Sequence, residues 1–220
     1  MTWIKICGTT SLEDALTSVD AGADALGFVF YEKSPRKMAA ETVREIVKKL
    51  PPEIERVGVF VSESIEQSSA IAKYCGLTAV QLHESRHQSI PVSSQPACKL
   101  FVATPARLLL EDPSRFNNRQ GDRQWINALF VDSGTAERPG GTGAPFDWQQ
   151  AAPGIEAIRN RFNIVIAGGL NSSNVTQAIR ILKPWGVDVV SGVEASPGKK
   201  DPEKVRAFIS SVREFEKSTP

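Results

Sequence analysis

Two stretches near the end of the chain, NIVIAGGLNSS at residues 163–173 and GVDVVSGVEAS at residues 186–196, decide how this sequence should fold. Each contains a short apolar, β-branched run, at residues 163–167 and 187–190, that leads into glycine within a few residues. Runs without polar alternation are typical of strands buried on both faces of a parallel sheet. The glycines could simply form tight turns, or they could bring backbone N–H groups close to an anion.

Six similar runs precede these two along the chain. Amphipathic patterns typical of helices separate them, for example Val43, Ile46, Val47 and Leu50 on one helical face. Ser11, Ser64 and Asn171 stand where helix N-caps are expected. The eight predicted strands are residues 3–7, 25–30, 56–61, 79–82, 98–103, 128–132, 163–167 and 187–190.

Eight strands that alternate with helices within 220 residues predict an α/β fold, a single (β/α)8 TIM barrel formed by residues 1–220 as one domain. An open doubly wound sheet with extra edge strands is the alternative. Residues 89–96 are rich in Ser, Pro and Gln and residues 111–123 are polar, so the elements there are expected to be short or irregular.

Composition favours a soluble, cytoplasmic protein. Hydrophobic residues make up 41% and charged residues 23% of the chain, and the formal net charge of +1 gives no general attraction to nucleic acid or to a membrane. We expect neither a signal peptide nor a membrane span. Three cysteines without a paired spacing predict neither a disulfide framework nor a metal site, and a reducing compartment fits them best.

In a (β/α)8 barrel, functional residues lie where strands end. Cys7 ends the first predicted strand and Asp132 ends the sixth. A thiol at this place can act as a base or nucleophile, although free cysteines are usually inert packing residues. A partly desolvated aspartate can act as a general acid, or it can merely cap a loop. As a pair, the two suit proton transfer beside a carbonyl or imine.

The same rule selects side chains that could bind a ligand. Arg36 follows Pro35 in the loop after the second strand, where a stiffened guanidinium could hold a carboxylate with two hydrogen bonds. His83 follows the fourth strand and could contact a ligand or form structural hydrogen bonds. For a phosphate we expect the glycine loops after the seventh and eighth strands: Gly168, Gly169, Ser191 and Gly192.

Several motifs together resemble phosphoribosylanthranilate isomerase, an enzyme family of tryptophan biosynthesis. They occur in the family's order from Lys5 to Asp201, and KICG together with SGVEASPGKKD is the most specific combination. The motifs are KICGTT, DALGFVFYEKSPRK, ERVGVFV, VQLHE, FVDSG followed by GGTG and FDW, IAGGLNSSNV and GVDVVSGVEASPGKKD.

The resemblance implies a cofactor-free Amadori rearrangement of N-(5-phosphoribosyl)anthranilate, a small-molecule substrate. By similarity Asp132 would be the general acid and Cys7 the general base. Arg36 would hold the anthranilate carboxylate, while Gly168, Gly169, Ser191 and Gly192 would hold the phosphate. The glycines of GGTG, including Gly141 and Gly143, would fold over the bound substrate. A member of this family could be a monomer or a homodimer.

Two departures and two alternatives accompany this interpretation. Glu84 stands where the family usually has glycine, and residues 85–96 and 104–123 match only loosely, which puts loop detail in doubt. The related aminoaldose isomerase of histidine biosynthesis runs the same rearrangement on a substrate with two phosphates, but it carries an acidic residue where this chain has Cys7. A barrel that binds a phosphorylated ligand without catalysis is the other alternative, which the intact Cys7 and Asp132 disfavour.

Overall fold

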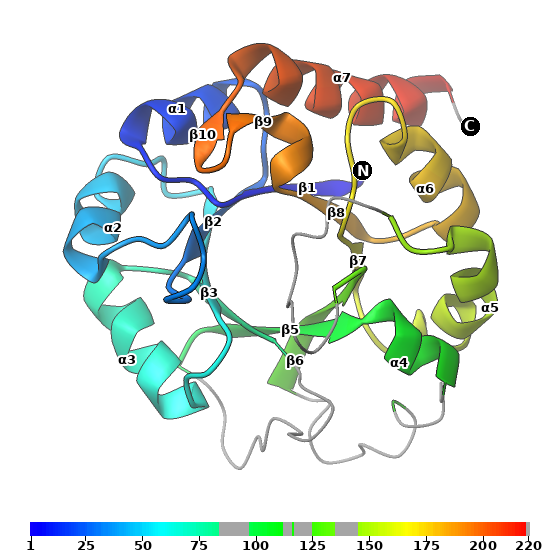
Figure 1. Ribbon diagram of the computed structural model, residues 1–220, viewed down its shortest axis with the longest axis horizontal. Helices are drawn as coiled ribbons and strands as arrows, with labels where there is room; N and C mark the ends of the chain where they lie inside the picture. The colour runs from blue at the N-terminus through cyan, green and yellow to red at the C-terminus, as the bar shows by residue number, and fades with distance from the viewer. Residues whose placement is uncertain (84–96, 112–115, 117–124, 135–144, 219–220) are drawn as a thin grey trace.

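In the computed structural model, eight parallel strands close into a barrel in chain order, with the helices around it (Figure 1). The structure describes residues 1–83, 97–111, 116, 125–134 and 145–218. The last strand pairs with the first, so the predicted (β/α)8 barrel is confirmed and the open sheet is excluded. The strands are β1 (Trp3–Cys7), β2 (Ala25–Val29), β3 (Glu55–Phe60), β4 (Ala79–His83), β5 (Lys99–Pro105), β6 (Ile126–Asp132), β7 (Ile164–Ile166) and β8 (Gly186–Val189).

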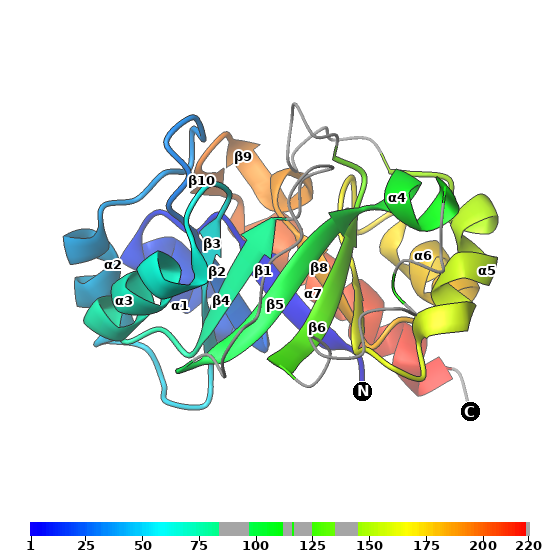
Figure 2. The ribbon, with the colours of Figure 1, turned by 90° about the horizontal axis from the view of Figure 1, so that it is seen from below.

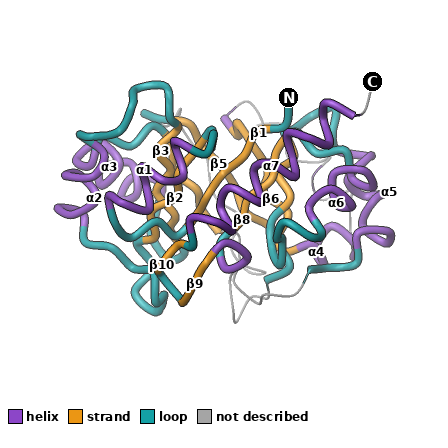
Figure 3. The backbone as a smooth tube through the Cα atoms, turned by 90° about the horizontal axis from the view of Figure 1, so that it is seen from above, coloured by secondary structure: helices purple, strands orange, loops and turns teal. Residues whose placement is uncertain are grey.

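The helices lie outside the strands and bury one face each against the barrel (Figure 3). Val43, Ile46, Val47 and Leu50, the apolar face predicted from the sequence, are all buried. The helices are α1 (Leu12–Asp20), α2 (Ala40–Val47), α3 (Ile65–Cys75), α4 (Ala106–Glu111), α5 (Trp148–Ile158), α6 (Val175–Leu182) and α7 (Pro202–Ser218). A single 3-10 turn, η3 (Ser191–Val193), follows β8.

Two of the three predicted helix caps are confirmed. The Ser11 side chain accepts a hydrogen bond from the N–H of Asp14, and Ser64 forms a capping box with Gln67. The prediction for Asn171 was wrong, because α6 begins only after Asn174. The Asn171 side chain instead accepts hydrogen bonds from Ser173, a local turn that competes with helix formation.

The barrel interior is filled with aromatic rings at its amino-terminal end. The Trp3 ring packs edge-on against Phe101 and Phe130, with centroids 5.9 and 6.2 Å apart. Lys5 Nζ lies 5.3 Å from the centroid of the Phe130 ring, one layer further along the barrel. In the part of the chain that the structure describes, these side chains fill the amino-terminal end of the interior, and a cavity lies at the carboxyl end of the strands.

A short hairpin, formed by β9 (Glu194–Ser196) and β10 (Lys199–Lys200), lies at that carboxyl end. Figure 2 shows it on the opposite side of the barrel from both chain termini. The hairpin follows directly after η3, and a hydrogen bond from the Thr10 hydroxyl to the Gly198 carbonyl ties it to the loop after β1. The last strand of the barrel and the first are thus bridged by a second, separate element.

Candidate active site

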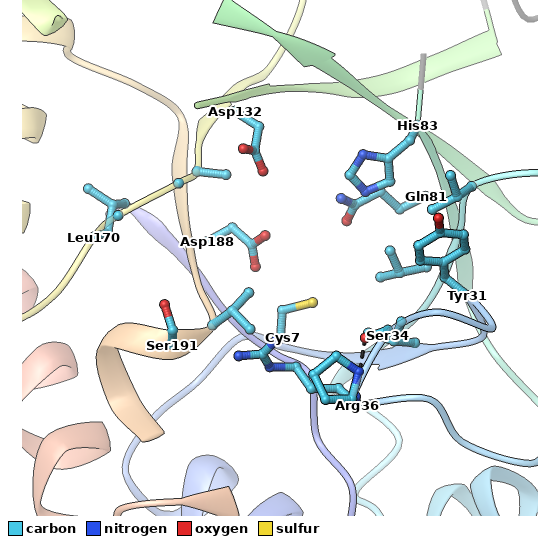
Figure 4. A pocket seen from close by; sticks show the side chains of 18 of the residues that line it. Cys7, Tyr31, Ser34, Arg36, Gln81, His83, Asp132, Leu170, Asp188 and Ser191 are labelled. Atoms are coloured by element: carbon cyan, nitrogen blue, oxygen red, sulfur yellow. Dashed lines mark hydrogen bonds between the residues drawn. The ribbon is translucent and has the colours of Figure 1, made fainter. Parts of the chain in front are cut away.

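A cavity of about 410 Å³ opens at the carboxyl end of the barrel (Figure 4). Seven residues selected from the sequence line it together: Cys7, Arg36, His83, Asp132, Gly168, Gly169 and Ser191. Gly192 follows Ser191 in the sequence and is not among the residues that line the cavity. Gly141 and Gly143 fall outside the described residues. The cavity is also lined by Tyr31, Gln81 and Asp188, which the sequence analysis did not select.

Cys7 is buried at the end of β1, with Val29 and Val59 packed around it. Gly27 on the neighbouring strand β2 leaves room for the Cys7 thiol, since a Cβ at Gly27 would lie 2.6 Å from Cys7 Sγ. Burial raises the pKa of Cys7, while the Lys5 ammonium acts in the opposite direction. Burial therefore favours the neutral thiol, and any thiolate that forms here is a strong base with a cation beside it.

Beneath Cys7, Lys5 and Asp188 form an ion pair inside the barrel. Lys5 Nζ lies 2.9 Å from Asp188 Oδ1, and the two side chains are 0% and 6% exposed. Although burial opposes it, the charges of Asp188 and Cys7 raise the pKa of Lys5, which remains an ammonium. The pair places a fixed cation below the cavity floor, where an anion that forms at Cys7 would be stabilised.

Asp132 ends β6 and faces the cavity from the side opposite Cys7 (Figure 4). Its Oδ1 accepts a hydrogen bond of 2.6 Å from the Gly134 N–H. Burial raises the pKa of Asp132 in spite of that bond and of the nearby Lys5. A carboxyl group whose pKa is raised holds its proton to higher pH, which is the property that a general acid needs.

Arg36 reaches the cavity from the loop after β2, and its guanidinium is already partly occupied. Nε and Nη2 donate hydrogen bonds of 2.7 and 2.6 Å to the two carboxylate oxygens of Glu194. The Arg36 N–H donates to Ser34 Oγ at 3.2 Å, which orders the loop (Figure 4). The hydrogen bonds to Glu194 also raise the pKa of Arg36. A ligand carboxylate would therefore meet an arginine whose position is fixed in advance.

His83 lies on the cavity wall at the end of β4, beside Gln81 (Figure 4). Burial, together with the positive charge of Lys5, lowers the pKa of His83 to about 4. The imidazole is therefore neutral near pH 7 and can donate one hydrogen bond and accept another. Within the described residues, the buried Gln81 Oε1 has no hydrogen-bond partner, so it is an acceptor available to a ligand.

The glycine loops after β7 and β8 pack against each other. Residues with side chains would not fit at the positions of Gly168 and Gly192. Gly168 and Gly169 have φ values of +83° and +68°. A Cβ at Gly168 would lie 2.2 Å from Ser133 Oγ, and one at Gly192 would lie 1.9 Å from the Leu170 carbonyl oxygen. The backbone is therefore held close to the cavity without side chains in the way, as anion binding by N–H groups requires.

Among the residues that the structure describes, no group of His, Cys, Asp and Glu side chains is suited to hold a metal ion. Nor does any described helix combine the length and the hydrophobicity that crossing a membrane would need.

Titratable groups on opposite sides of an enclosed barrel cavity are typical of (β/α)8-barrel enzymes that act by proton transfer. Comparisons with known proteins identify one family within this class. The family model described as N-(5'phosphoribosyl)anthranilate (PRA) isomerase matches residues 4–211, and the chain belongs to this family.

The chain is similar to individual members of the family over nearly its whole length. It is 42% identical to N-(5'-phosphoribosyl)anthranilate isomerase of Syntrophus aciditrophicus, over 98% of this chain and 89% of the relative. A solved phosphoribosyl anthranilate isomerase in complex with reduced 1-(o-carboxyphenylamino)-1-deoxyribulose 5-phosphate is 40% identical, with a TM-score of 0.78. Monomers generated from the dimeric enzyme of Thermotoga maritima are 38% identical, with a TM-score of 0.79. Both alignments cover 97% of this chain and 100% of the other.

Proposed function

We propose that this chain converts N-(5-phospho-β-D-ribosyl)anthranilate into 1-(2-carboxyphenylamino)-1-deoxy-D-ribulose 5-phosphate, a step of tryptophan biosynthesis. The observation that carries the proposal is that Cys7 and Asp132 face each other across one cavity, which Arg36 and the glycine loops also line. A substrate with a carboxylate, a phosphate and a sugar between them needs this set of groups.

The first step is assigned to Asp132. Its proton goes to the ring oxygen of the ribose, the bond between C1 and that oxygen breaks, and the nitrogen lone pair forms a C1=N double bond. The raised pKa of Asp132 supports this role because the group must be protonated when the substrate binds.

The second step is assigned to Cys7. The thiolate removes the proton from C2, and the electrons of that C–H bond form a C1=C2 bond while the C=N electrons return to nitrogen. The resulting enolamine tautomerises, so that C1 gains a proton, the C2 hydroxyl loses one and C2 becomes a ketone. No oxidant or cofactor is needed, since the atoms of substrate and product are the same. Lys5, beneath the thiol, favours the thiolate on which this step depends.

Binding is assigned to groups at the two ends of the cavity. Arg36 would hold the anthranilate carboxylate, and the N–H groups around Gly168, Gly169, Ser191 and Gly192 would hold the phosphate. His83, which is neutral near pH 7, would hydrogen-bond the sugar hydroxyls between them.

The purified protein tests the proposal directly. With phosphoribosylanthranilate as substrate, we expect the carboxyphenylamino-deoxyribulose phosphate to form, and liquid chromatography separates these two isomers of equal mass. A tryptophan auxotroph that lacks this isomerase should grow when it expresses the chain. Turnover of the aminoaldose of histidine biosynthesis alone would favour the histidine isomerase. Binding of the substrate without turnover would favour the non-catalytic barrel.

We also propose that the protein acts in the cytoplasm, where Cys7, Cys75 and Cys98, all free in the structure, would stay reduced. It would work there as a monomer or a homodimer, which sedimentation of the purified chain distinguishes.

A further inference from the structure

Glu194, the partner of Arg36, lies between two cations. Its Oε1 accepts a hydrogen bond of 2.7 Å from Arg36 Nε and lies 3.4 Å from Lys200 Nζ. The side chains of Glu194 and Lys200 are 4% and 0% exposed. Although burial opposes it, Arg36 and Lys200 hold the pKa of Glu194 below its ordinary value, so the carboxylate is ionised. We call these three residues the Arg36–Glu194–Lys200 triad.

Lys200 also connects the triad to the strand that carries Cys7. Its Nζ donates hydrogen bonds of 2.6 Å to the Cys7 carbonyl and 3.2 Å to the Val190 carbonyl. Its backbone N–H donates to Asp14 Oδ2 at 3.2 Å. Burial lowers the pKa of Lys200, whereas the Glu194 carboxylate acts in the opposite direction. Three oxygens, from Cys7, Val190 and Glu194, accept hydrogen bonds from its Nζ and stabilise the ammonium form. The residue that completes the triad therefore also fixes the end of β1, where the thiol is placed.

The triad leaves one edge of the guanidinium available. Glu194 occupies the edge formed by Nε and Nη2, whereas the edge formed by Nη1 and Nη2 has two N–H groups that no other described residue is seen to bind. The arginine stem lies over Gly8, where a Cβ would be 2.6 Å from Arg36 Cδ. The guanidinium is thus held along its stem and along one edge, and Arg36 lines the cavity.

The Arg36–Glu194–Lys200 triad carries a net positive charge. Two cations and one carboxylate leave one positive charge in a buried place, where charges are screened less than in water. Without Lys200, Glu194 would neutralise Arg36, and the free edge of the guanidinium would lose its attraction for a carboxylate. Without Glu194, the positive charge would remain, but nothing would orient the guanidinium.

We propose that Glu194 and Lys200 are positioning residues for substrate binding: Glu194 orients Arg36 so that its free edge meets the aryl carboxylate, and Lys200 preserves the positive charge of that edge. The proposal rests on the proposed function and names the device that would align the anthranilate half of the substrate. A misaligned carboxylate would move the sugar away from Cys7, so Glu194 affects turnover. Lys200 affects affinity, because it preserves the positive charge that attracts the carboxylate.

Calorimetric titration with anthranilate and, separately, with inorganic phosphate tests the proposal without depending on turnover. We expect Lys200→Met to weaken anthranilate binding about tenfold or more, because the triad becomes neutral. In the double variant Lys200→Met/Glu194→Gln, Arg36 regains its net charge, and anthranilate affinity should return to within about threefold of the wild type. Phosphate affinity should not change, nor should either affinity in the exposed control variant Lys199→Met.

A merely structural role makes the opposite prediction, since loss of two buried partners should weaken binding at least as much as loss of one. A double variant that binds anthranilate no better than Lys200→Met would overturn the proposal, as would a parallel loss of phosphate affinity. Thermal unfolding shows whether each variant is folded.

Glu194→Gln alone gives an independent measurement, should Lys200→Met fail to fold. We expect kcat to fall about tenfold or more while anthranilate affinity is kept, with Glu203→Gln as the exposed control. An unchanged kcat would overturn the proposal. A wild-type protein that binds anthranilate but does not turn over phosphoribosylanthranilate would refute the proposed function alone.

Discussion

Replacing Lys5 with methionine would test the ion pair beneath Cys7. Methionine nearly fills the volume of lysine but leaves the Asp188 carboxylate without its cation. The two side chains are 0% and 6% exposed, so water cannot solvate the remaining charge. Removal of one partner from a buried ion pair typically costs about 3–5 kcal/mol in the free energy of unfolding.

Lys48→Met is the matched control. Lys48 Nζ lies 2.6 Å from Glu45 Oε1, as close as the buried pair, but the two side chains are 54% and 64% exposed. An exposed pair of this kind contributes little to the free energy of unfolding, because water and salt screen it. Urea unfolding followed by circular dichroism should therefore separate the two variants by about 2 kcal/mol or more.

The pH dependence of the Lys5→Met variant follows from the unpaired carboxyl group. Burial raises the pKa of Asp188 even in the wild type, where Lys5 opposes the rise. Without Lys5, the pKa in the folded state rises further above its unfolded value of about 4. Between those two pKa values the folded chain binds more protons than the unfolded chain, so stability falls as pH rises. The deficit relative to the wild type should be larger at about pH 8 than at about pH 5. A deficit as small as that of Lys48→Met, or one that shrinks as pH rises, would refute this reasoning.

Three further predictions concern the cavity itself. Cys7→Ser and Asp132→Asn should each lower kcat by about 10²–10⁴-fold while the substrate still binds; rapid turnover in either variant would contradict the assigned acid and base. Arg36→Ala should mainly raise KM, and an unchanged KM would remove it from the carboxylate site. Gly168→Ala should weaken inorganic phosphate binding and lower the melting temperature, because its Cβ would collide with Ser133 at a φ of +83°; wild-type values of both would show that the turn tolerates a side chain.

The sequence was sufficient to predict the barrel because each strand is a local apolar run, buried on both faces, and needs no partner to be recognised. The rule that functional residues follow strand ends brought Cys7 and Asp132 to one cavity for the same reason. The apolar runs alone locate the carboxyl end of each strand to within about two residues, and closure of the barrel places these ends around one opening.

Contacts between distant segments could not be predicted in this way. Glu194 is 158 residues from Arg36, and Asp188 is 183 residues from Lys5. Both pairs depend on which strands become neighbours when the barrel closes. In the sequence, Lys5 lies between two isoleucines inside an apolar run, and Glu194 is one polar residue in a turn-like stretch. The Asn171 cap failed for a different reason, since the Asn171 and Asn174 side chains form a local turn before the helix begins.

The pairing of β1 with β8 has a consequence for the order in which the protein can mature. During synthesis the segment that carries Cys7 is made well before its neighbour β8 and before Lys200, which lies 193 residues further along the chain and holds the Cys7 carbonyl. Until then β1 has an exposed edge that can pair with other chains. A nascent chain arrested before β8 is therefore expected to aggregate and to depend on chaperones, and pairing of β8 with β1 both removes this hazard and completes the cavity.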